Sequence, residues 1–208
     1  MKLILPKKYL SYSALSLWKK DKHLFQQKYY EGIELPDTRY TLFGKEIALA
    51  LESGKYPQVP RYKKSEYAMN VLIEDIPILG YLDSFSPQRR AFLEYKSGIR
   101  HLNGDARWTQ LAVQQWDQLP FYSLLIKEKF GRVQNQCKLI WLETRNKEVQ
   151  EQIGSHVVET YSNELELTGH MEIFKRSIEE WERDRMREWI IKSALEISKD
   201  YATFKKKA

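Results

Sequence analysis

The feature that most constrains the fold is a change of hydrophobic period near the middle of the chain. Residues 79–84 alternate with a period of two, and this run stops at Ser86-Pro87-Gln88. A second short run, residues 91–96, ends at Ser97-Gly98. Two such runs joined by a proline-containing turn predict a β-hairpin. The flanking segments carry apolar residues at helical spacing. We therefore expect a mixed α/β or α+β domain, with helices around a few central strands.

Four helices are predicted around this hairpin, over residues 11–30, 41–52, 107–130 and 178–204. Ser11 or Ser13 is a suitable N-cap for the first helix. Pro120 should interrupt or kink the third, because a proline inside a helix removes a backbone hydrogen bond. The last helix carries a broad apolar face. Three further elements are expected: a loop over residues 54–64, a strand over 138–143 and a second hairpin around Thr168-Gly169.

The composition is that of a folded protein, since 42% of the 208 residues are hydrophobic and 30% are charged. This length suits a single domain over residues 1–208. The net charge of +6 permits an anionic partner without showing one, because the same excess also serves solubility. No apolar run approaches the roughly 20 residues of a membrane span, and the N-terminal residues do not resemble a signal peptide. We expect a cytoplasmic protein without membrane contact.

Two features of the sequence exclude other chemistries. Cys137 is the single cysteine, so the chain cannot hold a disulfide framework or a multi-cysteine zinc or iron–sulfur site. Gly44-Lys45 lacks the earlier glycine of a phosphate-binding Gly-x-x-x-x-Gly-Lys-Ser/Thr loop. Neither an iron–sulfur cluster nor a nucleotide cofactor is therefore expected.

Asp83, Glu94 and Lys96 form the constellation that points to chemistry. Residues two apart in a strand share a face, so Glu94 and Lys96 should project together, and the hairpin places Asp83 near Glu94. Two close carboxylates repel each other unless a cation lies between them, and Mg²⁺ takes carboxylate oxygens and several waters. Such an ion can activate water at a phosphodiester, and a neighbouring lysine can stabilise developing negative charge. The alternative is an ordinary cross-strand salt bridge.

Four segments in a fixed order resemble the PD-(D/E)XK nuclease superfamily, specifically its RecB-like branch of CRISPR-associated and phage exonucleases. The matching segments are residues 11–18, residues 43–52, residues 80–83 with 93–98, and residues 118–122 with 130–131. The third contains Gly-Tyr-Leu-Asp and Leu-Glu-Tyr-Lys-Ser-Gly, and the fourth contains Gln-Leu-Pro-Phe-Tyr. This resemblance implies a restriction-endonuclease-like core, in which helices flank a central mixed β-sheet and the N-terminal and long C-terminal helices are added.

The resemblance also implies roles for individual residues. Asp83 and Glu94 would bind Mg²⁺ or Mn²⁺ together with the backbone carbonyl of Tyr95, and Lys96 would be the catalytic lysine. Gln118 and Tyr122 lie four apart on one helical face, where the family uses this pair near the active site. Without the family, the simpler roles are a solvated helix residue for Gln118 and a core aromatic for Tyr122.

Two departures from the family pattern matter. The family often has a metal-binding histidine four residues after the glycine of the second helix, and here that position is Ala48. Glu52 lies on the same helical face and could reach the metal, although it could equally be a surface glutamate. The iron–sulfur cysteines of several RecB-like members are missing, and Cys137 is most simply a small buried residue.

Basic residues flank the predicted hairpin and could neutralise phosphates. They are Arg89, Arg90, Arg100 and Arg107. The resulting hypothesis is a Mg²⁺- or Mn²⁺-dependent deoxyribonuclease, with an exonuclease in recombination, repair or CRISPR-type processing favoured by the resemblance. The resemblance also allows a recombination or CRISPR-adaptation protein as partner. Two alternatives are a catalytically silent member that binds nucleic acid or a partner protein, and a structure-specific endonuclease.

Overall fold

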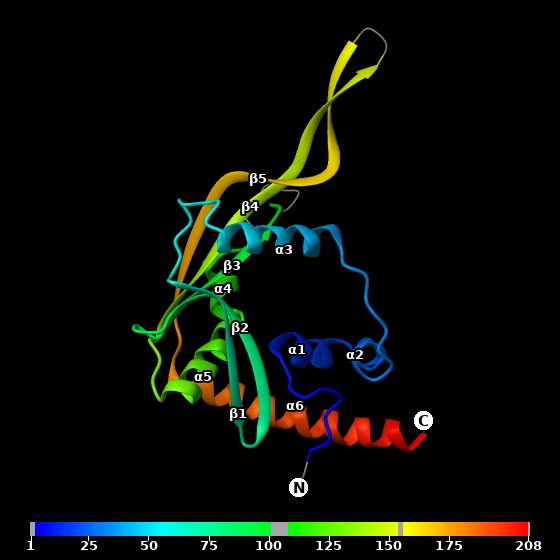
Figure 1. Ribbon diagram of the computed structural model, residues 1–208, viewed down its shortest axis with the longest axis vertical. Helices are drawn as coiled ribbons and strands as arrows, with labels where there is room; N and C mark the ends of the chain where they lie inside the picture. The colour runs from blue at the N-terminus through cyan, green and yellow to red at the C-terminus, as the bar shows by residue number, and fades with distance from the viewer. Residues whose placement is uncertain (1–2, 101–107, 154–155, 208) are drawn as a thin grey trace.

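The computed structural model describes residues 3–100, 108–153 and 156–207 (Figure 1). The described strands form one sheet in the order β1-β2-β3-β4-β5. Their bounds are Lys64–Ile73 for β1, Ile76–Ser86 for β2, Ala91–Gly98 for β3, Gln136–Ile153 for β4 and His156–Ser177 for β5. The β3 and β4 strands are parallel, and the other neighbours are antiparallel. A parallel pair requires a crossover, and the chain makes it through two helices.

The helices cover both faces of this sheet. They are α1 Tyr12–Lys20, α2 Lys22–Tyr29, α3 Arg39–Glu52, α4 Gln110–Gln115, α5 Gln118–Phe130 and α6 Glu180–Lys207. The α3 helix packs on one face, where Ile47 and Leu51 join the apolar side chains of β3 and β4. The α1, α2, α5 and α6 helices contribute to a larger core on the other face. The predicted mixed sheet with flanking helices and a long C-terminal helix is therefore confirmed.

The interior position of β4 explains why residues 138–143 have an almost continuous apolar sequence. Leu139 and Trp141 are fully buried in the larger core. Ile140 and Leu142 are buried in the smaller core beneath α3. A strand that is covered on both faces has no solvent side, so its polarity does not alternate.

Two of the predicted helices are each divided in the structure. A single helix over residues 11–30 is wrong, because Asp21 has extended backbone and its side chain accepts a hydrogen bond from the Leu24 N–H at 2.9 Å. It thereby ends α1 and caps α2. Within residues 108–130, Trp116 has extended backbone and separates α4 from α5. Pro120 lies in the first turn of α5, where a backbone N–H would have no partner within the helix, so it does not kink the helix.

The predicted hairpin around Thr168-Gly169 is also wrong. The β5 strand runs through both residues, and the register with β4 shifts between Leu142 and Thr144. Gly169 has a φ of +87° at this irregularity, a conformation that glycine adopts without strain. Beyond it, β4 and β5 extend from the rest of the protein as a long two-stranded ribbon (Figure 1). Within the described ranges, no helix is both long and apolar enough to span a lipid bilayer.

Candidate active site

The site begins where the β2 and β3 strands separate. Their register ends at the Ser84–Leu93 pair, and from there β3 pairs along its length with β4. Asp83 directly precedes Ser84 on β2, just beyond the last pair with β3, and its Oδ2 accepts a hydrogen bond from the Tyr95 N–H at 2.7 Å. The carboxylate therefore replaces a missing ladder partner and is held at the point of separation.

The Glu94 carboxylate is almost completely buried, with 1% of the residue exposed. Its Oε1 accepts hydrogen bonds from Lys96 Nζ at 2.9 Å and from Gln118 Nε2 at 3.0 Å. Its Oε2 is buried and has no hydrogen-bond partner among the residues that the structure describes. A buried, unpartnered carboxylate oxygen is costly, so this atom indicates a place for a cation or a water held by one.

The charges in this cluster are unbalanced. Burial and the neighbouring Asp83 carboxylate raise the pKa of Glu94 to about 8. Burial also raises the pKa of Asp83, although the Lys96 charge opposes the shift. Burial disfavours the charged form of Lys96, but Glu94 and Asp83 together outweigh it and raise the lysine pKa. The cluster thus keeps Lys96 protonated and lacks enough positive charge for its carboxylates.

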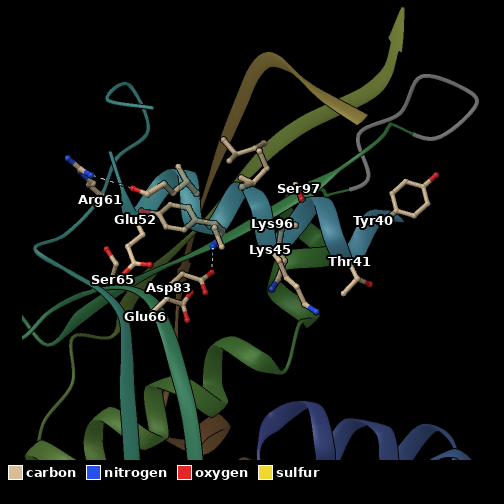
Figure 2. Close-up of a pocket in the computed structure, with 16 residues that line it drawn as sticks. Tyr40, Thr41, Lys45, Glu52, Arg61, Ser65, Glu66, Asp83, Lys96 and Ser97 are labelled. Carbon is tan, nitrogen blue, oxygen red and sulfur yellow. Dashed lines mark hydrogen bonds between the residues drawn. The ribbon is translucent and has the colours of Figure 1, made fainter. Parts of the chain in front are cut away.

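A cavity of about 390 Å³ opens beside this cluster, between α3 and the first three strands (Figure 2). Its lining includes Glu52, Glu66, Asp83 and Lys96. Figure 2 shows the three acidic residues gathered at one side of the pocket, away from Tyr40. Burial, together with the charges of Asp83 and Glu52, raises the pKa of Glu66.

Glu66 is the acidic residue that the sequence analysis missed. It belongs to β1, which was not predicted, and it lies between the Ser65–Ser84 and Tyr67–Leu82 pairs, opposite Asp83. Its φ of +44° is unusual for a non-glycine residue and marks an irregularity in this strand. The signal that could have revealed the strand is the period-two apolar series Tyr67, Met69, Val71 and Ile73.

The α5 helix brings Gln118 and Tyr122 to the cluster. The Gln118 amide donates to Glu94 Oε1 and to the Tyr122 hydroxyl, each at 3.0 Å. Tyr122 is buried and packs against the strand at Gly80, where an added Cβ would lie 2.8 Å from the tyrosine ring. Gly80 therefore permits the close approach of α5 to β2. Both helix residues combine a structural contact with a place at the site.

On α3, the structure places Ala48 and Glu52 along the same cavity. Glu52 comes from the last residue of the helix, and its carboxylate is close enough to influence Glu66. The small Ala48 side chain offers no metal ligand where the family often has histidine.

The predicted arginines are not brought together at this cavity. Arg89 is exposed in the β2–β3 turn. Arg90 stacks on Phe130 with its guanidinium carbon 4.1 Å from the ring centre. Arg100 forms an ion pair with Glu143 at 2.5 Å. Arg107 lies outside the described residues. None of the three described arginines lines the cavity.

The cluster provides ligands of the kind that a hard divalent cation prefers. Across residues 3–100, 108–153 and 156–207, no three His, Cys, Asp or Glu side chains converge as a ready-made metal cage. Mg²⁺, however, commonly takes only one or two carboxylates and keeps several waters. Asp83, the free Oε2 of Glu94 and the Tyr95 carbonyl fit this requirement.

Solved exonuclease structures share the fold of this chain at low sequence identity. A "putative exonuclease" of Eubacterium rectale has a TM-score of 0.58 and 11% identity, over 93% of this chain and 82% of its own. A phage-related exonuclease of Haemophilus somnus 129PT has a TM-score of 0.53 and 13% identity, over 91% and 82% of the two chains. An alkaline exonuclease of Laribacter hongkongensis has a TM-score of 0.53 and 9% identity, over 96% and 92%.

The sequence comparisons add no closer relative. No protein-family model and no curated protein matches the chain. The structural comparisons nevertheless show that the chain shares the fold of these solved exonuclease structures, with a central sheet, flanking helices and a long C-terminal helix.

Proposed function

We propose that this protein is a metal-dependent nuclease that hydrolyses phosphodiester bonds in DNA. The observation that carries the proposal is the buried, unpartnered Oε2 of Glu94 beside Asp83 and Lys96. Buried polar atoms are generally hydrogen-bonded, so a buried carboxylate oxygen without a partner supports a cation site. The exonuclease fold of the chain supports the same reaction class.

Asp83, Glu94 and the Tyr95 carbonyl would hold Mg²⁺ or Mn²⁺, and Glu52 and Glu66, which lie at the same side of the cavity as Asp83, would bind its waters. The bound cation would supply an activated water and positive charge at the phosphoryl group. The Gln118 amide and the Lys96 ammonium both occupy Oε1 of Glu94. They thereby fix the carboxylate with Oε2 available to the cation.

Lys96 acts as a fixed positive charge. In the metal-free cluster, Glu94 and Asp83 raise the pKa of Lys96 and favour the protonated ammonium. The ammonium would stabilise the negative charge that develops on the phosphoryl oxygens as water adds and the P–O bond to the leaving strand breaks. The Trp116 ring, 5.0 Å from Nζ, covers the ammonium and restricts its orientation.

A catalytically silent nucleic-acid-binding protein is the second candidate, and Ala48 is the observation that favours it. With alanine lining the cavity, the cation loses the nitrogen ligand that the family often supplies. An active nuclease and a silent binding protein would share the same remaining carboxylates, so only a cleavage assay distinguishes the two candidates.

Labelled DNA provides the test. Linear and circular DNA, single- and double-stranded, should be incubated with Mg²⁺, Mn²⁺ or EDTA. We expect cleavage that requires the cation and is lost in Asp83→Asn. Release of nucleotides from linear DNA with intact circles would identify an exonuclease, and cutting of circles an endonuclease. Binding without cleavage in either metal would support the silent protein and contradict the proposal.

A further inference from the structure

A second cavity, of about 680 Å³, shares Lys96 with the first. It lies between the N-terminal segment with α1 and the β2 strand, and Gln118 and Tyr122 also line it. We infer that this second cavity binds an unpaired nucleic-acid strand beside the phosphate that is cleaved at Lys96. The inference rests on the proposed function, because it extends the substrate from the reacting group to its neighbouring nucleotides.

The two cavities differ sharply in charge. The first contains Glu52, Glu66 and Asp83, whereas the lining of the second includes no acidic residue. Its polar groups are the hydroxyls of serines and tyrosines, the Gln118 amide and two lysines. Hydroxyl, amide and ammonium groups are those that contact phosphates and sugars, so the second cavity is the one that suits a polyanion without a cation.

Lys20 supplies positive charge to this cavity that the protein does not itself neutralise. Three lysines lie close together where α1 meets α2. Lys19 pairs with Asp117 at 3.9 Å and Lys22 with Glu196 at 3.5 Å. Lys20 lines the cavity, is exposed and has no ion pair to any described residue. It is therefore available to a phosphate of the bound strand.

The β2 strand connects the two cavities with an exposed aromatic side chain. Tyr81 and Asp83 are two apart and share a face of β2, with Tyr81 in the second cavity and Asp83 in the first. Tyr81 is 49% exposed, and Tyr9, which also lines the second cavity, is 41% exposed. Large exposed tyrosines beside a basic groove are suited to stacking on bases. Bases stacked within a duplex are not free for this contact, so the occupant is an unpaired strand.

Binding in EDTA tests the inference without cleavage. A fluorescently labelled oligothymidylate would be titrated with wild type, Tyr81→Leu and Lys20→Gln, and its anisotropy measured at several salt concentrations. We expect Tyr81→Leu to weaken binding by about fivefold or more. Lys20→Gln should lower the slope of log affinity against log salt by about 0.7, as expected for one lost phosphate contact on a single strand. A blunt duplex should bind more weakly to wild type.

Two matched variants serve as controls. Tyr161→Leu removes a tyrosine on the β4–β5 ribbon that is even more exposed than Tyr81, and Lys22→Gln removes a lysine that is paired outside the cavity. Both should bind like wild type, and circular dichroism should show that all variants fold. Wild-type binding by Tyr81→Leu and Lys20→Gln, or equal losses in the controls, would overturn the inference.

The two proposals fail in different ways. Metal-dependent cleavage with unchanged oligonucleotide binding by both cavity variants would refute the second cavity and leave the nuclease standing. Selective loss of binding in these variants, with no cleavage in any metal, would support the second cavity and refute the nuclease.

Discussion

The Arg176 cluster and the Glu94 cluster are both buried groups of charged residues in the described part of the chain, and they differ in how completely their carboxylates are satisfied. The first contains Arg176 of β5 and Glu182 of α6, both almost fully buried. Arg176 donates to the Val113 and Trp116 carbonyls at 2.9 and 2.7 Å and pairs with Glu182. The other Glu182 oxygen accepts the Glu179 N–H at 2.9 Å. Both Glu182 carboxylate oxygens thus have a partner, although Arg176 Nε is buried without one among the described residues.

The Glu94 cluster is the opposite case. One oxygen of Glu94 has two donors and the other has none. Asp83 and Glu66 add further carboxylates, while Lys96 is the cation that holds Glu94. The comparison teaches that burial of charge does not by itself identify an active site. The distinguishing property is a buried carboxylate that lacks some of its hydrogen-bond partners and lies beside a cavity that can admit a cation.

Removal of Lys96 should have the largest effect. Lys96→Met eliminates the charge that stabilises the transition state, so we expect cleavage to fall by about 10²- to 10³-fold. The measurement is single-turnover cleavage in Mn²⁺. Lys127→Met, which removes a lysine paired with Glu180 on the surface, is the control and should cleave normally. Equal losses of cleavage in both variants would contradict a specific catalytic role for Lys96.

Removal of Arg176 should mainly affect stability. Arg176→Met leaves Glu182 buried and unpaired, so the free energy of unfolding should fall by about 3 kcal/mol. Replacing both residues, as Arg176→Met with Glu182→Leu, should recover much of this loss because no uncompensated charge remains. Urea denaturation measures both effects.

The control for this pair is exposed. Arg145 pairs with Glu166 at 2.8 Å on the β4–β5 ribbon, and Arg145→Met should leave the free energy of unfolding little changed, because exposed ion pairs contribute little to stability. A loss in Arg145→Met as large as that in Arg176→Met would contradict the role assigned to the buried pair.

Neutralising Glu94 should stabilise the metal-free protein in alkaline solution. Folding raises the glutamate pKa from its ordinary value of 4.5 to about 8. The stability that the protonated Glu94 gives to the folded protein is fully present below pH 4.5. It is lost as the pH rises toward 8, because the carboxyl group ionises more easily in the unfolded chain. In EDTA at pH 8.5, Glu94→Gln should therefore unfold at a higher temperature than wild type. The corresponding gain in the free energy of unfolding should be about 1 kcal/mol or more. A lower unfolding temperature would show that Glu94 is satisfied without a cation.

Gln118 should have the smallest effect of these side chains. Gln118→Leu removes one donor from Glu94 and one from Tyr122, while Lys96 continues to hold the same carboxylate oxygen. We expect cleavage to fall about tenfold, corresponding to one lost hydrogen bond to a charged group. Steady-state kinetics should show the loss in kcat with KM little changed. A change confined to KM would assign Gln118 to substrate binding instead.

Local patterns made much of the fold predictable. The β2–β3 hairpin and the long α6 helix have strong period-two and helical spacing, and both are present in the structure. The missed elements depend on less regular signals. Asp21 divides the first predicted helix because its side chain caps α2. At Gly169 the sequence predicted a turn, but the β5 strand continues through this residue with an irregularity in its pairing. Neither choice is apparent from hydrophobic spacing alone.

The candidate site was less accessible to sequence reasoning than the fold. Asp83, Glu94 and Lys96 are separated by few residues, so a hairpin prediction suffices to bring them together. Glu66 reaches the cavity only through the pairing of β1 with β2, which was not foreseen. Arg90 and Arg100 were predicted to contact phosphates, but Arg90 stacks on Phe130 and Arg100 pairs with Glu143. Such contacts between distant segments are not encoded in local spacing.

Binding of Mn²⁺ tests the central claim most directly. Electron paramagnetic resonance of free Mn²⁺, titrated with protein at pH 8, measures binding independently of cleavage. The account predicts saturable binding by wild type and by Lys96→Met, and binding weakened at least tenfold in Asp83→Asn and Glu94→Gln. Unchanged Mn²⁺ binding in these two carboxylate variants, or no binding by wild type, would contradict it.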